Sequence, residues 1–268
     1  VVLDTHHHPI AVHRGVEVAS THEYVLVLDL VGPDEGVSRA DRRDATAHEA
    51  DPVRSSIAPS RDPIHHSATL HAAQQGTPVQ DLYLHVFQPV QREIGRLWQV
   101  NRLSVAQEHY VTAATQLFMS QLYPRIFNTT RVGRCLVATC VGSELHEIGV
   151  RMVADLFEMA GWDSYYLGAN TPLRGVLQAL EERQADVLAI SATLTVHVGQ
   201  VREMIERVRA QVSDRAPVIL VGGYPFLLSS GLWRRVGADG FAPDAQEAVR
   251  VATALVDVQR GTHAGVRG

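Results

Sequence analysis

A histidine with a carboxylate close by is the strongest chemical signal in the sequence. His146 follows Glu144 by two residues within the segment GSELHEIG at positions 142–149. A carboxylate at this distance can accept a hydrogen bond from one imidazole nitrogen, which raises the basicity of the other nitrogen toward a metal. The pair predicts a metal-ligating imidazole, and the alternative is a histidine that only caps the helix after it.

A second group of residues combines a large apolar ring with polar side chains. Trp98 is followed, after nine residues, by Glu108 and His109. An indole offers a rigid apolar surface, and a carboxylate and an imidazole can hydrogen-bond a ligand beside it. Taken one at a time, these residues also suit a core aromatic that closes one helix and two surface groups on the next.

Two cysteines, Cys135 and Cys140, fall on one expected strand. Side chains five positions apart on a strand point to opposite faces, so the two are not expected to form a disulfide. Cys140 ends that strand near the expected ligand-binding edge, where a thioether to a bound ligand and a buried structural thiol are the two alternatives. The tract His6, His7 and His8 lacks further metal ligands at a recognised spacing.

The second half of the sequence alternates short apolar runs with helical stretches. This alternation is typical of successive βα units around a parallel sheet. The expected strands are 135–141, 163–167, 187–191, 218–221 and 240–242. The expected helices are 146–160, 173–183, 196–212, 224–231 and 245–260. The sequence therefore predicts an α/β fold with a five-stranded, parallel, doubly wound sheet.

Helical periodicity precedes this region. A short helix is expected over 64–75, and a second over 79–98 has apolar residues at three-and-four spacing. Pro89 inside the second helix predicts a kink. A third helix follows Ser104, a capping residue with Gln107 three positions on, and extends to about residue 127. We expect a helical-bundle cap at 63–130, the α/β domain at 131–268, and a segment of uncertain fold at 1–62.

In doubly wound sheets, ligands bind outside the carboxyl ends of the strands, where the strand order reverses. His146 follows the first expected strand, Ser191 and Thr193 come at the end of the third, and Gly222 and Gly223 follow the fourth. Glycines suit many strand-to-helix turns. Their significance therefore lies in their order together with the histidine.

The segment ELHEIG, 144–149, resembles the Asp/Glu-x-His-x-x-Gly signature of cobalamin-binding domains. In that family the histidine replaces the cofactor's own dimethylbenzimidazole base beneath cobalt. The resemblance implies that His146 is the cobalt ligand, that Glu144 supports it, and that Gly149 belongs to the cofactor-binding motif.

Two further patterns match the same family. Ser191 and Thr193 correspond to its Ser-x-Leu pattern, with threonine at the leucine position, and Gly222 and Gly223 correspond to its glycine pair. In the family both patterns border the buried nucleotide tail of the cofactor, and the resemblance implies that role here.

The tryptophan group resembles the Trp-x9-Glu-His pattern of helical caps in light-sensing cobalamin-binding regulators. There the three residues cover the upper face of the cofactor, which implies adenosylcobalamin covered by Trp98, Glu108 and His109. Those regulators carry a histidine directly after the tryptophan, where this sequence has Gln99. The open alternatives are His109 or His197 in that role, the absence of photochemistry, or a linear tetrapyrrole such as biliverdin in the same pocket.

Composition and charge exclude several classes of function. A formal net charge of −5 provides no positive field for phosphates, so direct nucleic-acid binding is not expected. No apolar run reaches the roughly 18 residues that span a bilayer, so we expect no membrane segment and a cytoplasmic protein. Residues 1–60 show no helix-turn-helix pattern. A homo-oligomer or a regulatory protein partner is expected instead.

These observations favour a photoreceptor that changes conformation or oligomeric state when a tetrapyrrole between cap and sheet absorbs light, rather than an enzyme. The alternative is a corrinoid methyl-carrier subunit of a methyltransferase system, which shares the fold and the histidine motif. Trp98 with Glu108 and His109 favours the sensor, because a carrier must open its upper face to partners. A mutase subunit would need a substrate barrel that 268 residues do not provide.

Overall fold

The computed structural model describes residues 72–127, 129–212 and 216–265. The expected helix 64–75 lies mostly outside this part of the chain, and residues 1–62 and the histidine tract lie wholly outside it. The chain divides into two compact units, of which the first contains Pro89–Gln121 and the second contains Val79–Gln88 and Leu122–Gly268. We refer to them as the helical unit and the α/β unit.

The α/β unit is built on a five-stranded, fully parallel sheet with the order β2-β1-β3-β4-β5. This arrangement confirms the predicted fold class. The strand order reverses between β1 and β3, which lie side by side in the middle of the sheet. The strands are β1 Cys135–Cys140, β2 Asp163–Gly168, β3 Val187–Ser191, β4 Val218–Gly222 and β5 Gly240–Phe241.

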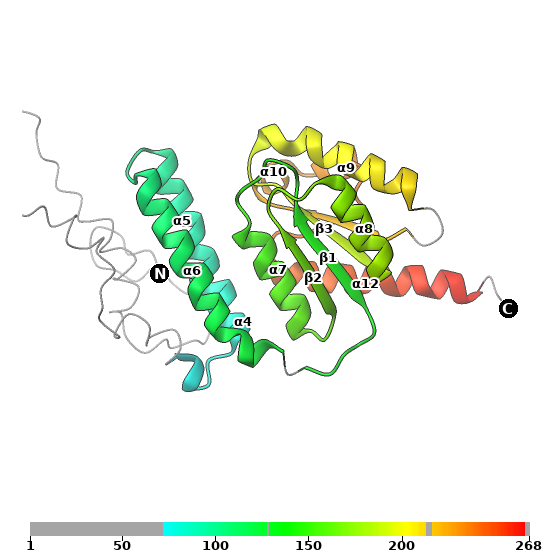
Figure 1. Ribbon diagram of the computed structural model, residues 1–268, viewed down its shortest axis with the longest axis horizontal. Coiled ribbons are helices and arrows are strands. Elements are labelled where there is room, and N and C mark those ends of the chain that lie inside the picture. The colour runs from blue at the N-terminus through cyan, green and yellow to red at the C-terminus, as the bar shows by residue number, and fades with distance from the viewer. Residues whose placement is uncertain (1–71, 128, 213–215, 266–268) are drawn as a thin grey trace, which may run out of the picture. The chain divides into compact units, whose positions relative to one another are not determined.

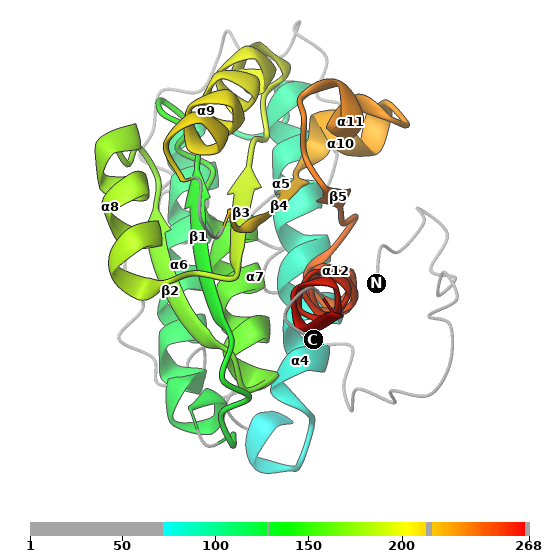
Figure 2. The same ribbon diagram turned by 90° about the vertical axis from the view of Figure 1, so that its right-hand side faces the viewer.

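Helices cover both faces of the sheet, as Figures 1 and 2 show. Helices α7 (Ile148–Met159) and α12 (Ala245–Gly265) pack on one face, and α8 (Leu173–Arg183) and α9 (Val198–Gln211) pack on the other. Two short helices, α10 (Tyr224–Leu228) and α11 (Leu232–Arg235), follow β4.

Strand β1 shows why the sheet has two apolar faces. Its six residues are all buried, and alternate side chains enter opposite cores. Cys135 packs in the core under α8 and α9, whereas Cys140 packs in the core under α7 and α12. Both cysteines are free and buried, as their odd spacing predicted.

Among the described residues, the helical unit contains residues 72–78, helix α5 (Gln88–Gln99) from Pro89 onward, and helix α6 (Val105–Ile126) as far as Gln121. The predicted capping residue is present: the Ser104 hydroxyl donates to Gln107 Oε1 at 2.9 Å, and the Gln107 amide donates back to that hydroxyl oxygen. The two helices share a small apolar cluster of Ile94, Leu97, Leu103 and Val111.

The segment before α5 differs from the kinked helix that Pro89 predicted. Helix α4 (Val79–Leu82) leads into a π-helical turn, Tyr83–Phe87, which continues directly into α5. A proline ring collides with the carbonyl four residues earlier, here that of His85, and a widened turn moves this carbonyl aside. The predicted kink is therefore a π-helical turn before the proline.

Other element boundaries also differ from the expected ranges. The expected helix 146–160 begins only at Ile148, so His146 lies in a loop. The expected helix 224–231 stops at Leu228 because Ser229 is extended. No helix among the described residues is both long enough and apolar enough to cross a membrane.

Candidate functional site

The loops after β1 and β3 meet where the strand order reverses. Cys140 at the end of β1 pairs with Ser191 at the end of β3, which in turn pairs with Gly222 at the end of β4. The sheet therefore brings the predicted residues after these three strands to one edge. Ser191 and Gly222 are both half-buried there.

Glu144 is the centre of this edge. Its side chain is fully buried, and both carboxylate oxygens accept hydrogen bonds. Oε1 accepts from the backbone amide of His146 at 3.1 Å and from the Nδ1 of the same residue at 2.5 Å. Oε2 accepts from the amides of Thr193 and Leu194, at 2.7 and 3.2 Å, and from His197 Nδ1 at 2.9 Å. One carboxylate thus joins the loops after β1 and β3.

The environment of Glu144 keeps it ionised. Burial alone raises the pKa of this carboxyl, but the hydrogen bonds from His146, His197 and the Thr193 amide outweigh burial and hold the pKa well below its usual range. An ionised carboxylate only accepts hydrogen bonds. Nδ1 of His146 must therefore carry the proton, which puts the lone pair of the neutral ring on Nε2.

This geometry suits His146 as a ligand to a metal. The side chain is 46% exposed although its carboxylate partner is fully buried. Among the described residues, no group of three or more His, Cys, Asp or Glu side chains could hold a metal ion by itself. A single accessible imidazole instead fits a metal that brings its other ligands in a macrocycle, as the cobalt of a corrinoid does.

The three predicted glycines differ in their structural reasons. Gly149 lies in the first turn of α7, where an added Cβ would meet nothing within 4 Å, so the protein's own packing does not require glycine. At Gly223 the backbone φ is +103°, and a Cβ would lie 2.0 Å from the Ala192 carbonyl oxygen. This close approach by itself explains Gly223. At Gly222 a Cβ would make an ordinary contact.

The tryptophan group belongs to the helical unit. Trp98 is 41% exposed near the end of α5. On α6, Glu108 Oε2 lies 3.5 Å from His109 Nε2, while Thr112 Oγ1 donates to Glu108 Oε1 at 2.9 Å. The His109 side chain is 73% exposed. The predicted role of these residues above a cofactor stays a prediction.

Two candidate side chains differ from their sequence-based interpretation. Cys140 is fully buried, and burial raises the pKa of its thiol to about 12, so it is unsuited to a thioether link with a bilin. His197, considered as an upper cobalt ligand, is buried and donates to Glu144. Sequence reasoning missed this support because the two residues are 53 positions apart.

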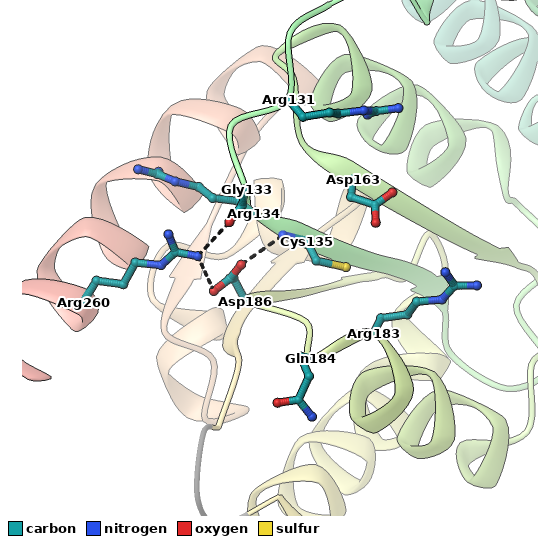
Figure 3. A pocket seen from close by; sticks show the side chains of 9 residues that line it. All are labelled: Arg131, Gly133, Arg134, Cys135, Asp163, Arg183, Gln184, Asp186 and Arg260. Carbon is teal, nitrogen blue, oxygen red and sulfur yellow. Dashed lines mark hydrogen bonds and ion pairs between the residues drawn. The ribbon is translucent and has the colours of Figure 1, made fainter.

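A concave region lies at the opposite, amino-terminal edge of the sheet. It has a volume of about 560 Å³ (Figure 3). Arg260 donates to Asp186 at 2.9 Å, and Asp186 in turn accepts from the amide of Cys135. These bonds connect α12 to the starts of β1 and β3, so we interpret the region as a structural network. Its lining includes the charged residues Arg131, Arg134, Asp163, Arg183, Asp186 and Arg260.

Comparison with known families agrees with this geometry. Residues 134–251 match a family described as B12 binding domain, and residues 66–123 match a second family with the same description. The chain belongs to the B12-binding family. The first match covers the B12-binding sheet with Glu144 and His146, and the second covers Trp98, Glu108 and His109.

Relatives of this B12-binding chain are corrinoid proteins. Dimethylamine corrinoid protein 3 of Methanosarcina acetivorans is 30% identical over 122 residues, which are 45% of this chain and 56% of the relative. Dimethylamine corrinoid protein 2 of the same organism is 26% identical over 165 residues, which are 61% and 73% of the two chains. The B12-binding chain thus spans little more than half of the first relative.

The fold is also that of a solved corrinoid protein. The structure of the Methanosarcina barkeri monomethylamine corrinoid protein has a TM-score of 0.64 and 19% identity, with coverage of 71% of this chain and 90% of that one. This likeness concerns the fold alone.

These relatives contradict the photoreceptor hypothesis, which is wrong. The hypothesis depended on the resemblance of Trp98, Glu108 and His109 to the caps of light-sensing regulators. The relatives, however, are named dimethylamine corrinoid proteins, and none of these names indicates a light sensor. The corrinoid itself is supported, whereas neither the adenosyl form nor biliverdin gains support. A tryptophan on a helical cap does not distinguish a sensor from a carrier.

Proposed function

We propose that this chain is a corrinoid carrier that presents a methyl group to a methyltransferase partner. The observation that carries the proposal is the ionised, fully buried Glu144, which holds the half-exposed His146 ring with its Nε2 lone pair available in the required tautomer. The named dimethylamine corrinoid proteins among the relatives favour a carrier within the B12-binding family.

The proposal assigns a role to each residue of the α/β unit. His146 Nε2 would ligate the cobalt of a bound corrinoid, and Glu144 keeps the ring proton on Nδ1. Gly149 leaves open space beside the first turn of α7 for the cofactor. The nucleotide tail is bordered by the residues at the ends of β3 and β4, which are Ser191, Thr193, Gly222 and Gly223.

The upper face is assigned to the helical unit. We propose that Trp98, Glu108 and His109 cover it and that they contact a small methyl group in place of the adenosyl group that the sequence suggested. A bound corrinoid would supply a cobalt atom that accepts and donates a methyl group.

In this proposal the chain is part of an enzyme system and is not a catalyst alone. His197, Thr193 and Leu194 hold Glu144, so His146 keeps one orientation while the methyl group is exchanged. A protein partner is then required, and dimethylamine is the first methyl donor to test. A cytoplasmic location and a homo-oligomer stay predictions.

The first test is ligation. Purified protein is mixed with hydroxocobalamin, and the complex is reduced to the Co(II) state. The protein carries 15N-labelled histidine, so that coupling from its imidazole can be told from coupling to the cofactor's own benzimidazole. The expected result is an electron paramagnetic resonance spectrum with coupling from one 15N nucleus, lost in His146→Ala. The matched control is His109→Ala, which removes an exposed imidazole on the helical unit. 15N coupling that persists in His146→Ala refutes the assignment of the lower ligand.

The second test is methyl transfer. The protein is loaded with methylcobalamin that carries an isotope label in its methyl group. It is then incubated in the dark and without oxygen, together with a thiol acceptor and an extract of the cells that naturally make the protein. A carrier should lose the labelled methyl group to the thiol much faster than free methylcobalamin does. Equal rates for bound and free cofactor would reject the carrier and leave the ligation result standing.

A further inference from the structure

A second buried carboxylate lies outside the corrinoid site, in the middle of α7. Asp155 is 6% exposed, and its Oδ2 accepts a hydrogen bond from the hydroxyl of Tyr83 at 2.7 Å. The Tyr83 side chain is itself completely buried. Because 72 positions separate the two residues, this bond fastens a distant segment of the chain to α7.

Tyr83 begins the π-helical turn at the entrance to the helical unit. The stretch Val79–Gln88, which we call the root segment, groups with the α/β unit, whereas Pro89–Gln121 groups with the helical unit. Phe87 of the root segment is also buried. The Tyr83–Asp155 bond is therefore a polar anchor of the root segment on α7.

The other charged and titratable groups around Asp155 come from α6 and α7. Arg151, one turn earlier on α7, donates to the Tyr123 hydroxyl from Nη2 at 2.9 Å and from Nε at 3.2 Å. Its guanidinium carbon also lies 5.3 Å from the centre of the Tyr123 ring. Glu158, one turn later, forms an ion pair with Arg131. The anchor thus has one nearby cation that is shared with a phenol.

Burial dominates the titration of this carboxyl. It raises the pKa of Asp155 to about 6, although the Tyr83 hydrogen bond and the Arg151 charge act in the opposite direction. The charge of Glu158 adds to the rise. Burial and the neighbouring Asp155 also raise the pKa of Tyr83, so its hydroxyl remains a donor. At neutral pH a charged carboxylate is thus held in a site that disfavours charge.

We propose that the root segment Val79–Gln88 is a releasable attachment of the helical unit, which docks firmly on α7 when Asp155 is protonated and undocks more readily when Asp155 is ionised. Undocking hydrates the carboxylate, which relieves the cost of burying its charge. Because the residues involved lie outside the corrinoid site, the inference is independent of the carrier function.

The direction and size of the pH effect on undocking follow from the protonation equilibria of Asp155 in the docked and the undocked form. A hydrated aspartate has a pKa of about 3.9, roughly two units below the docked value, so ionisation favours the undocked form by up to about 100-fold. Between pH 5.0 and 7.5 the same two equilibria predict an increase in undocking of about tenfold. Below about pH 3 both forms are protonated and the effect disappears.

Hydrogen exchange on the full chain tests the proposal. Amide exchange of the root segment, corrected for the intrinsic rate, is measured at pH 5.0 and 7.5, with the β1 peptide as internal reference for global unfolding. In Asp155→Asn, exchange of the root segment at pH 7.5 should be on the order of 100-fold slower than in the unmodified protein. The control is Asp163→Asn, an exposed carboxylate at the start of β2, which should change nothing.

A second variant moves exchange in the opposite direction. Tyr83→Phe removes the donor and leaves the buried carboxylate without that hydrogen bond, so exchange of the root segment at pH 7.5 should become faster. Exchange in Asp155→Asn that equals the unmodified protein at pH 7.5, or exchange in the unmodified protein that is independent of pH, overturns the proposal. Should Asp155→Asn fail to fold, unchanged or slower exchange in Tyr83→Phe is the refuting result.

Discussion

Replacement of Glu144 by glutamine tests how the protein selects the tautomer of His146. The carboxylate accepts two hydrogen bonds from His146 on one oxygen and three on the other, from Thr193, Leu194 and His197. Glutamine keeps the volume but offers only one carbonyl oxygen. The glutamine carbonyl oxygen should take the position that faces Thr193, Leu194 and His197, because three donors converge there and only two come from His146. The amide NH2 group then faces His146.

The consequence for the imidazole follows from simple donor and acceptor counting. A neutral His146 can meet an NH2 group only by accepting at Nδ1, and the ring proton then moves to Nε2. A protonated Nε2 has no lone pair for cobalt. Loss of such support for a metal ligand typically lowers affinity about 10- to 100-fold, which corresponds to about 1.4–2.8 kcal/mol. The remaining unmatched donor, the His146 amide, should cost about 1–3 kcal/mol of folding free energy.

The assay compares Glu144→Gln with Glu147→Gln, a matched change three positions later in the chain. Glu147 Oε2 accepts from the amide of Ala169 at 2.9 Å, and a glutamine carbonyl can take over that bond. Titration with hydroxocobalamin and the coupling of 15N-labelled histidine to the Co(II) form are measured for both. Only Glu144→Gln should lose affinity and coupling. If the coupling and the affinity of Glu144→Gln equal those of the wild-type protein, the argument that Glu144 selects the tautomer of His146 is refuted.

Three further outcomes follow from the same structure. Gly149→Ala should raise the stability of the cofactor-free protein by up to about 1 kcal/mol in urea unfolding, because its Cβ meets open space, and it should weaken corrinoid binding in the same titration. Gly223→Ala should lower stability by at least 2 kcal/mol, roughly, because the positive φ and the Ala192 carbonyl both oppose a side chain. The folded pKa of Asp155 lies above its unfolded value, so the folded protein binds more protons between about pH 4 and 6 and loses stability as pH rises through that window. Thermal unfolding of Asp155→Asn should therefore show a gain of about 2–3 kcal/mol at pH 8 that is about half as large at pH 5.

Much of the α/β unit could be predicted from the sequence because periodicity is a local property of the chain. Alternation of apolar runs and helical stretches predicted all five strands to within one residue at each end. The capping pair Ser104 and Gln107 likewise acts within one turn and was predicted correctly. Helix boundaries that depend on a tertiary environment, as at His146 and at Pro89, were less accurate.

The choice between photoreceptor and carrier could not be made from motifs. The histidine motif serves both kinds of protein, because in both an imidazole ligates cobalt. Trp98 lies on α5, and Glu108 and His109 lie on α6. The types of these residues do not indicate whether a methyl group or an adenosyl group would contact them. The named relatives corrected this point, and the roles of the individual site residues stay predictions.

By itself, the sequence determined the order of strands and helices along the chain and the place of the Glu144–His146 pair after the first strand, since each depends on residues a few positions apart. Only the tertiary structure decided that His197 donates to Glu144 and that Tyr83 donates to Asp155. Parallel pairing of β1 with β3 brings two loops, some 50 residues apart in the chain, to the carboxylate of Glu144. Packing of the root segment on α7 buries the carboxylate of Asp155. Whether a buried charge is stabilised or strained depends on donors that only the folded chain assembles.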